Sequence, residues 1–529
     1  MKANSTEILR ESCRYKAGLM PDIIVRNALY YPNGEAFIYG DQRRTFEQYN
    51  ERVNSLVHAL YDLGVRKGDV IGVLSWNCID YMDVFGAAAK GGFIISPFNV
   101  RLSAAEIEYL INNSEAHLLF VGSEMAQVLE PLKSKIRRVE HFISLEGPLP
   151  GMKSETNLIE NYPKSEPDVD IEEKDPFLIC YTSGTTGLPR GALYTHGRVR
   201  EDILCHSIEV PVGVEDKGIS LMPFFHIGGI EITQYLLYNA ATNVIMKSFD
   251  PKSLLATIEK EKITNVVLVP THLAVMLDLP EFQKTDVSSV KRIYYAGSPM
   301  PTEILKRGMK AFGSVFFQGY GQTESGPVIA FLREKDHEVL NRPPEEQERL
   351  LSIGYPAMGV HVRIVDEDGK DVGPGEVGEI IAKSRHLMEA YWRKPEETKE
   401  TITDGWLHTR DMGRYDKDGY IYIVDRKQDM IVSGGENIYP REVEEVLYRH
   451  PAVAECAVIG IPDPKWVEAV HAVVCLRRGA TVIAEELIDF CKKNIARYKA
   501  PKSIDMVQEL PKNATGKILK REIRKKYRT

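Results

Sequence analysis

The feature that most constrains this chain is an apolar run that ends in a loop rich in glycine and hydroxyl groups. Residues 176–181 (Pro-Phe-Leu-Ile-Cys-Tyr) predict a buried strand, and residues 182–191 then read Thr-Ser-Gly-Thr-Thr-Gly-Leu-Pro-Arg-Gly. Glycines let backbone N–H groups turn inward, hydroxyls add donors, and Arg190 supplies a fixed positive charge. The stretch therefore indicates a loop that cradles a polyphosphate, with a flexible surface loop as the alternative.

The residues after this loop separate it from the familiar nucleotide loops. Ala192-Leu193-Tyr194-Thr195-His196 predicts a second strand, so the order is strand–loop–strand. A P-loop NTPase would place a helix there, and the G-x-x-x-x-G-K-[ST] spacing is absent. This is a phosphate loop of another kind.

Length and composition limit the class of protein. A chain of 529 residues is long for one core, so at least two domains are expected. The net charge of −8 gives no general basic field, and nucleic acid is not expected as a partner. Seven cysteines without a C-x-x-C pair argue against a zinc site and a disulfide framework. With no signal-peptide core and no transmembrane run, we expect a cytoplasmic enzyme, which could form a homo-oligomer.

Short apolar segments alternate with helical patterns in the N-terminal half, which predicts a layered α/β body. Residues 45–65 predict an amphipathic helix with Thr45 as N-cap, residues 70–74 a strand, and Ser103 with Glu106 a capping box. The charged stretch 333–350 is expected to be a solvated excursion. About a hundred residues after position 428 suffice for a small second domain.

Two further segments combine a strand with a turn suited to a nucleotide. Residues 293–299 end in Gly297 and Ser298, where a flat ring such as adenine can lie against backbone. Residues 316–324 end in Gly-Tyr-Gly-Gln-Thr-Glu: Tyr320 can stack on adenine, Thr323 can donate to an α-phosphate, and Glu324 can hold Mg²⁺. The dinucleotide pattern G-x-G-x-x-G is incomplete here, and a structural turn is the alternative.

A third segment, 511–518, reads Pro-Lys-Asn-Ala-Thr-Gly-Lys-Ile. With the loop at 181–191 and the segment 316–324, it resembles the adenylate-forming superfamily of acyl-CoA synthetases, luciferases and amino-acid-adenylating domains. The resemblance spans residues 181–517. It implies a large α/β body over residues 1–427 and a small, mobile C-terminal α+β lid over residues 428–529, with a hinge near Gln428. This sequence departs from the family at Arg190, usually Lys; at Arg410, more often Gly; and at Gln428, usually Asp or Lys.

The resemblance also implies ATP, Mg²⁺ and coenzyme A as cofactors and assigns a role to individual residues. In catalysis it implies Lys517 for adenylation, Arg190 and Thr323 for the phosphates, and Glu324 for the metal. Residues implied in nucleotide or coenzyme A binding are Thr182, Ser183, Gly184, Thr185, Thr186, Gly187, Gly297, Ser298, Gly319, Tyr320, Gly321, Asp411 (ribose), Arg426, Gly434, Gly435, Trp466, Tyr498 and Lys502.

One segment bears on the identity of the acid substrate. Residues 222–229 read Met-Pro-Phe-Phe-His-Ile-Gly-Gly and resemble the acyl-pocket segment of the family. No Asp lies between Leu221 and Gln234 to pair with a substrate ammonium, which disfavours an α-amino acid. We expect a small-molecule carboxylic acid of medium-chain, alicyclic or aromatic type. The pocket candidates are His226, Ile227, Gly228, His272 and Ala296, although a histidine such as His226 is also a common core residue.

The hypothesis is an ATP-dependent acyl-CoA synthetase that works through acyl-AMP and releases AMP and pyrophosphate. Three alternatives stay open: a non-catalytic nucleotide-binding relative, an enzyme that loads a carrier-protein thiol, and the same ligase run in reverse to make ATP.

Residues 492–529 hold thirteen Lys and Arg against three Asp and Glu. That basic excess suits the phosphates of coenzyme A, but a solubilising tail and, more weakly, nucleic acid are other interpretations.

Overall fold

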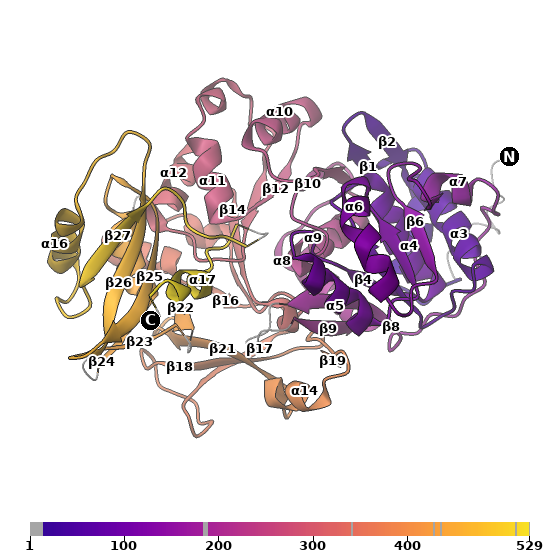
Figure 1. Cartoon of the computed structure of the whole chain (residues 1–529). Helices are drawn as coiled ribbons and strands as arrows, with labels where there is room; N and C mark the ends of the chain where they lie inside the picture. Colours follow the sequence, from indigo (N-terminus) through magenta and orange to yellow (C-terminus); the bar gives the residue numbers. More distant parts are fainter. Residues whose placement is uncertain are drawn as a thin grey trace.

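The computed structural model describes residues 14–182, 189–339, 342–426, 429–433, 436–513 and 516–527. Two mixed sheets covered by helices make up a large N-terminal body, and a smaller antiparallel sheet adjoins it. In Figure 1 the C-terminal part, in gold and yellow, lies at the opposite side of the molecule from the indigo N-terminal helices. The predicted architecture, a large α/β body with a small C-terminal domain, is confirmed.

The first sheet carries the ends of the phosphate loop. β8 (Pro176–Thr182) pairs antiparallel with β9 (Arg190–Thr195), so that Thr182 lies opposite Arg190. The two predicted strands, the second of them in place of a helix, are therefore confirmed, and residues 183–188 between them lie outside the described residues. Across the sheet the order is β19 (Ala390–Tyr391), β9, β8, β4 (Ile94–Pro97), β3 (Val70–Leu74), β5 (Leu118–Val121), β6 (His141–Ser144) and β7 (Lys153–Ser154).

The second sheet brings several strand ends to one edge. Its neighbouring strands from β14 to β1 are parallel, so their carboxyl ends point the same way. The order is β16 (Tyr355–Pro356), β15 (Ala330–Leu332), β14 (Phe316–Tyr320), β13 (Arg292–Tyr295), β12 (Asn265–Leu268), β10 (Lys217–Ser220), β11 (Thr242–Ile245), β1 (Glu35–Tyr39) and β2 (Gln42–Thr45). Ligands of parallel α/β sheets bind at such carboxyl ends.

Local capping residues define the helices of the body. Thr45 caps α3 (Phe46–Asp62) in a capping box with Gln48, and Ser103 with Glu106 does the same for α5 (Ala104–Ser114), as predicted. The other body helices are α2 (Met20–Tyr30), α4 (Ile79–Gly91), α6 (Ala126–Leu129), α7 (Glu155–Ile159), α8 (His196–Glu209), α9 (Ile227–Tyr238), α10 (Pro251–Glu261), α11 (Pro270–Leu277), α12 (Thr302–Phe312), α13 (Pro344–Gln347) and α14 (Pro395–Thr401).

The remaining strands form two smaller sheets. The one beside the body consists of β17 (His361–Val365), β18 (Gly378–Lys383), β20 (Ile402–Thr403), β21 (Trp406–Tyr415) and β22 (Ile421–Arg426). The C-terminal one consists of β23 (Ile431–Ser433), β24 (Glu436–Ile438), β25 (Val453–Asp463), β26 (Val467–Leu476) and β27 (Ser503–Val507), with α15 (Pro440–Tyr448), α16 (Ala484–Asn494) and α17 (Lys520–Lys525) packed on it.

The charged stretch 333–350 is not simply the solvated excursion that its composition predicts. His337 is fully buried and contacts the hydroxyl of Tyr295 through Nε2 at 3.0 Å. Leu350 is also buried, and Arg333 donates to both carboxylate oxygens of Glu209 at 2.8 Å. The segment therefore packs its few apolar and aromatic side chains on the second sheet while its charges face outward or pair.

A cluster of buried carboxylates in the first half of the body has a structural role. Asp80, Asp83 and Glu155 lie close enough to share a metal ion. Arg44 donates to Asp80 at 3.1 Å and Asp83 at 2.6 Å, and Arg52 reaches Asp83 at 2.7 Å and Glu155 at 2.8 Å. The two guanidinium groups thus supply the positive charge, and the cluster holds α3, α4 and α7 together. Within the described residues, no helix is both long and apolar enough to span a bilayer.

Candidate functional site

The end of β14 meets the middle of β21 through a direct side-chain contact. The Tyr320 hydroxyl donates to Oδ2 of Asp411 at 2.7 Å, and both residues are buried. The backbone N–H of Asp411 donates to the Thr409 hydroxyl at 3.1 Å, and Asp411 pairs with Arg426 across the β21–β22 ladder. Residues expected to contact adenine and ribose are therefore neighbours in space, although 91 positions separate them in the chain.

Glu324 lies where the two large sheets meet. It belongs to a single 3₁₀ turn (Thr323–Ser325) after β14 and is 9% exposed. Its Oε1 accepts a hydrogen bond from the Tyr391 hydroxyl at 2.7 Å and a longer one from Thr182 at 3.5 Å. The Tyr194 hydroxyl donates to the carbonyl oxygen of Thr323. The proposed metal ligand is thus fixed by the strands that flank the phosphate loop.

Arg190 lies at the start of β9, and one of its N–H hydrogen-bond donors is unused by the described residues. Its guanidinium lies over the Tyr391 ring, 4.4 Å from the centroid, and reaches Glu397 at 3.4 Å. The buried Nε of Arg190 has no hydrogen-bond partner among the described residues. A cation with an unused buried donor fits a polyphosphate ligand. The loop residues Ser183, Gly184, Thr185, Thr186 and Gly187 lie outside the described residues.

Close backbone packing explains the glycines of the nucleotide segment. A Cβ on Gly321 would lie 1.8 Å from the carbonyl oxygen of Pro327, and one on Gly319 would lie 1.9 Å from the Tyr294 hydroxyl. Neither position tolerates a side chain. Gly297 has φ +83° and open space around it, so it exposes backbone at the carboxyl end of β13, next to the half-buried Ser298.

The loop that carries Lys517 contacts the body. Gly516 has φ +82°, and a Cβ there would lie 2.9 Å from the Thr271 hydroxyl oxygen and 3.8 Å from Nε2 of His272. Thr271 and His272 belong to the first turn of α11. Lys517 is half-buried, and its backbone N–H donates to Oδ1 of Asn513 at 2.8 Å. The structure therefore holds the C-terminal lysine loop against the helix that follows β12.

Two more contacts join the C-terminal part to the body. Arg441 at the start of α15 donates to the carbonyl oxygen of Leu351 at 3.1 Å and to that of Ile423 at 2.9 Å. Arg477 reaches Asp278 at 3.7 Å, just beyond α11. Together with the lysine loop, these contacts join the two parts in this arrangement.

The acyl-pocket candidates gather at the starts of α9 and α11. His226 is the N-cap residue of α9, and its removal from water, together with the nearby charge of Arg101, lowers its pKa to about 4. His272 stacks on Phe249 with ring centroids 3.8 Å apart, and burial lowers its pKa to about 3. Both rings are neutral at pH 7. A Cβ on Gly228 would meet nothing within 4 Å, so open space lies beside the first turn of α9.

Other candidates remain apart from this group or outside the described residues. Trp466 and Tyr498 are 39% and 45% exposed on the C-terminal part, and Lys502 is exposed at the start of β27. Within the described parts of the chain, no hydrogen bond or ion pair joins these three side chains to the nucleotide residues. Gly434, Gly435 and Gln428, and the side chain of Arg426, lie outside the described residues.

Sequence analysis missed two tyrosines that support the site. Tyr391 contacts Glu324 and Arg190, and Tyr194 holds Thr323, yet neither lies in a recognisable pattern. β19 pairs with β9 through Ala390 and Tyr391, a long-range pairing that local sequence does not encode. The backbone at Arg410 has φ +61°, a conformation that favours the glycine usual in the family over arginine, and the Arg410 side chain is exposed.

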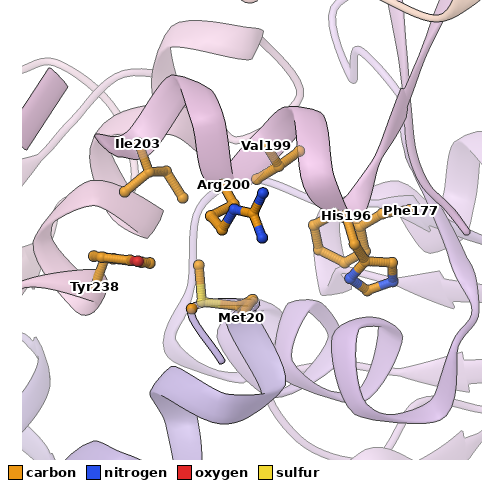
Figure 2. Close-up of a pocket in the computed structure, with 8 residues that line it drawn as sticks. Met20, Phe177, His196, Val199, Arg200, Ile203 and Tyr238 are labelled. Carbon is orange, nitrogen blue, oxygen red and sulfur yellow. The ribbon is translucent and has the colours of Figure 1, made fainter. Parts of the chain in front are cut away.

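A separate narrow crevice lies between α2, β8, α8 and α9 (Figure 2). His196 stacks on Phe177 with ring centroids 4.6 Å apart, and the other labelled lining residues are Met20, Val199, Arg200, Ile203 and Tyr238. Burial lowers the pKa of His196 to about 3. No predicted site residue lines this crevice, and it is too narrow for a ligand, so we assign it no function.

Comparison with known proteins agrees with this geometry. The family model described as "AMP-binding enzyme" matches residues 24–392, and that of the "AMP-binding enzyme C-terminal domain" matches residues 442–517. The chain therefore belongs to the AMP-binding enzyme family. By class it is an AMP-forming ligase that joins an acid to coenzyme A.

Relatives match along almost the whole chain. It is 34% identical over 505 residues to a feruloyl-CoA synthase from Amycolatopsis sp., covering 95% of this chain and 98% of that one. It is 32% identical to the fatty acid–[acyl-carrier-protein] ligase ScoC of Streptomyces coeruleorubidus, covering 95% of each. The structure of the anthranilate CoA ligase AuaEII with anthranoyl-AMP superposes with a TM-score of 0.89 at 28% identity, covering 97% and 98%.

Proposed function

We propose that this protein activates a carboxylic acid of medium-chain, alicyclic or aromatic type as acyl-AMP and then transfers the acyl group to coenzyme A. The observation that carries the proposal is the position of the Lys517 loop. It lies against Thr271 and His272, and His272 is one of the acyl-pocket candidates. The same molecule brings Glu324 and Arg190 together at Tyr391, and Asp411 together with Tyr320.

In the first step a carboxylate oxygen attacks the α-phosphorus of ATP. The bond between the α-phosphorus and its bridging oxygen breaks, and pyrophosphate leaves. Asp411 and Tyr320 bind the nucleoside, Arg190 stabilises the departing phosphates, and Lys517 brings the two anions together. Aligning two reactants and neutralising their charge is the main contribution a protein can make to phosphoryl and adenylyl chemistry.

Glu324 is the proposed ligand of Mg²⁺. A carboxylate in a nearly closed site, oriented by Tyr391 and Thr182, suits a hard cation that prefers oxygen ligands. The bound ion would neutralise phosphate charge.

In the second step the sulfur of coenzyme A attacks the acyl carbon of acyl-AMP. The bond from that carbon to the AMP oxygen breaks, AMP leaves, and the thiol proton is released to water. We propose that the C-terminal part, residues 428–529, first turns about Gln428 and withdraws Lys517. Trp466, Tyr498 and Lys502, exposed on that part, are then available to coenzyme A.

A second candidate function is transfer to a carrier-protein thiol, because the relative ScoC is a ligase of that kind. Net synthesis of ATP from acyl-CoA, AMP and pyrophosphate is the same chemistry in the opposite direction. The range of acids named for relatives, from ferulic to fatty acids, does not select one for this chain.

The test is a pyrophosphate-release screen across carboxylic acids, with and without coenzyme A, followed by mass spectrometry of the products. We expect Mg²⁺-dependent pyrophosphate and AMP with at least one acid of the proposed types, and an acyl-CoA product. Pyrophosphate release without a thioester to coenzyme A would favour the carrier-protein alternative. No release from any acid would refute the proposed function.

A further inference from the structure

A small cavity of about 20 Å³ lies between α8, α9 and the second sheet. Its walls come from β10, β12 and β13 on one side and from helical residues such as Ile232 and Tyr235 on the other. Its widest part has room for about one water molecule. The lining is mostly apolar, and its polar residues Asn265 and Arg292 bond to each other and to Thr264 and Asp216. A polar lining group that lacks such a partner is therefore an informative exception.

That exception is His206 of α8, which is 1% exposed. Three aromatic rings enclose it, those of Tyr235, Tyr294 and Phe331, with centroids 4.7, 5.0 and 5.4 Å away. Nδ1 of His206 contacts Oε1 of the buried Glu231. Nε2 has no hydrogen-bond partner among the described residues. An orphaned ring nitrogen in a buried cavity is costly unless something binds it.

The cavity shares α9 and β13 with the proposed acyl end of the site. Its lining residues nearest to that end are Ile232, one turn after Gly228 on α9, and Tyr294, two residues before Ala296 on β13. The Tyr294 hydroxyl also abuts Gly319. Along α9 the lining residues Ile232 and Tyr235 are about 6 and about 10 Å from Gly228. This is the reach of a carboxylic acid that carries one aromatic ring.

We propose that this cavity receives a water-sized hydrogen-bonding substituent, such as a hydroxyl, at the far end of an aryl carboxylic acid, and that His206 Nε2 binds it. The inference rests on the proposed function and narrows its substrate class to substituted aromatic acids. A hydroxyl both donates and accepts, so it satisfies Nε2 in either protonation state of the ring. Because Nδ1 contacts Glu231, Nε2 is the ring nitrogen that remains for a ligand in the cavity.

An alkyl acid would not use this arrangement. Its terminal methyl group would fill the space for one water molecule and leave Nε2 of His206 without a hydrogen bond. A site built around a buried polar group rejects ligands that cannot form a hydrogen bond to that group. The same holds for an aromatic acid without the substituent. The distal hydroxyl therefore determines which acid is preferred. The reaction at the carboxylate is the same for an alkyl acid, an unsubstituted aromatic acid and a hydroxylated aromatic acid.

The matched probes are 4-hydroxycinnamic, cinnamic and decanoic acids. Binding is measured by calorimetry on the full chain with α,β-methylene-ATP, whose α,β bond cannot be cleaved to pyrophosphate, so it does not depend on turnover. We expect the wild-type protein to bind 4-hydroxycinnamic acid at least about tenfold more tightly than cinnamic acid, as one additional hydrogen bond to a buried group would give. Decanoic acid should bind more weakly still.

The variant is His206→Phe combined with Glu231→Gln, which leaves no unpaired buried carboxylate. It should bind cinnamic acid as well as the wild type does and lose the preference for the hydroxyl. His206→Gln keeps a hydrogen-bonding group and should restore part of that preference. His196→Phe is the control: His196 is on the same helix, buried and without a partner among the described residues, but it faces the crevice of Figure 2.

The outcomes separate this inference from the proposed function. The inference is supported by a tenfold preference that the double variant removes, His206→Gln partly restores and His196→Phe retains, whatever the rate of turnover. Equal binding of the two aromatic acids, no binding of either, or an unchanged preference in the double variant would overturn it. Pyrophosphate release with ATP is measured on the same samples, and its absence from every acid would count against the proposed function alone.

Discussion

Glu324 shows how a single residue of the site is positioned by contacts from distant parts of the chain. Its carboxylate accepts from Tyr391 and from Thr182, while its own backbone carbonyl accepts from the N–H of Met388 at 3.0 Å. Oriented in this way, the carboxylate keeps its direction when a cation binds. The negative charge is then the property that the proposed metal site requires, and shape alone is not enough.

Glu324→Gln should therefore preserve the fold and lose Mg²⁺-dependent adenylation by about 100-fold or more, the cost of removing one preorganised charge. Pyrophosphate release over a Mg²⁺ titration measures the loss, and the melting temperature checks the fold. Tyr391→Phe, which removes the donor but keeps the charge, should have a smaller effect. Wild-type activity of Glu324→Gln at ordinary Mg²⁺ would show that the metal ligand lies elsewhere.

At the scale of elements, the decisive contact is between the 513–518 loop and the first turn of α11. Gly516 allows it for two reasons: its φ of +82° is costly for other residues, and there is no room for a Cβ next to Thr271. The contact places the backbone of the Lys517 loop beside His272, one of the acyl-pocket candidates. A small change at Gly516 should thus affect the reaction in which Lys517 takes part.

Gly516→Ala should lower acyl-AMP formation about tenfold and leave thioester formation from supplied acyl-AMP nearly unchanged. Gly479→Ala is a matched control, because Gly479 is also in the C-terminal part and has φ +80°, but nothing lies within 4 Å of its added Cβ. The Gly479→Ala variant measures only the free-energy cost of placing alanine at a positive φ, about 1–2 kcal/mol. Equal effects of the two substitutions would mean that the loop contact is not used in adenylation.

The same elements show what sequence can and cannot predict. β8 and β9 could be predicted because a continuous apolar run and a glycine-rich turn are local signals. The pairing of β19 with β9, which brings Tyr391 to Glu324, is set by tertiary packing and leaves no local pattern. The contact between His206 and Glu231 could not be predicted from the sequence either, because the burial of an isolated polar side chain depends on how distant elements pack together.

Across the whole molecule, several buried histidines connect stability to pH. Burial lowers the pKa of His196 to about 3 and that of His337 to about 4, below the ordinary value of 6.5. Below pH 6.5 the unfolded chain takes up protons at these positions and the folded protein does not. Stability is therefore lost as pH falls from 6.5 toward those lower values, by up to about 1.4 kcal/mol per pH unit for each histidine.

His196→Phe should reduce this loss, so that urea unfolding at pH 5 and pH 7 gives more similar free energies than in the wild type. His361→Gln is the control, because His361 is exposed at the start of β17 and its ring remains in water. A pH dependence that is identical in His196→Phe and the wild type would show that His196 is protonated in the folded protein.

The central claim for the whole molecule is that Lys517 serves the first half-reaction and is absent from the second. Lys517→Ala tests it most directly, with each half-reaction assayed alone: acyl-AMP formation from acid and ATP, and thioester formation from synthetic acyl-AMP and coenzyme A. Lys512→Ala is the control, because Lys512 lies in the same loop and pairs with Glu455 at 2.6 Å. We predict a loss of about 10²–10³-fold in the first half-reaction only. Equal losses in both, or none in either, would contradict the account.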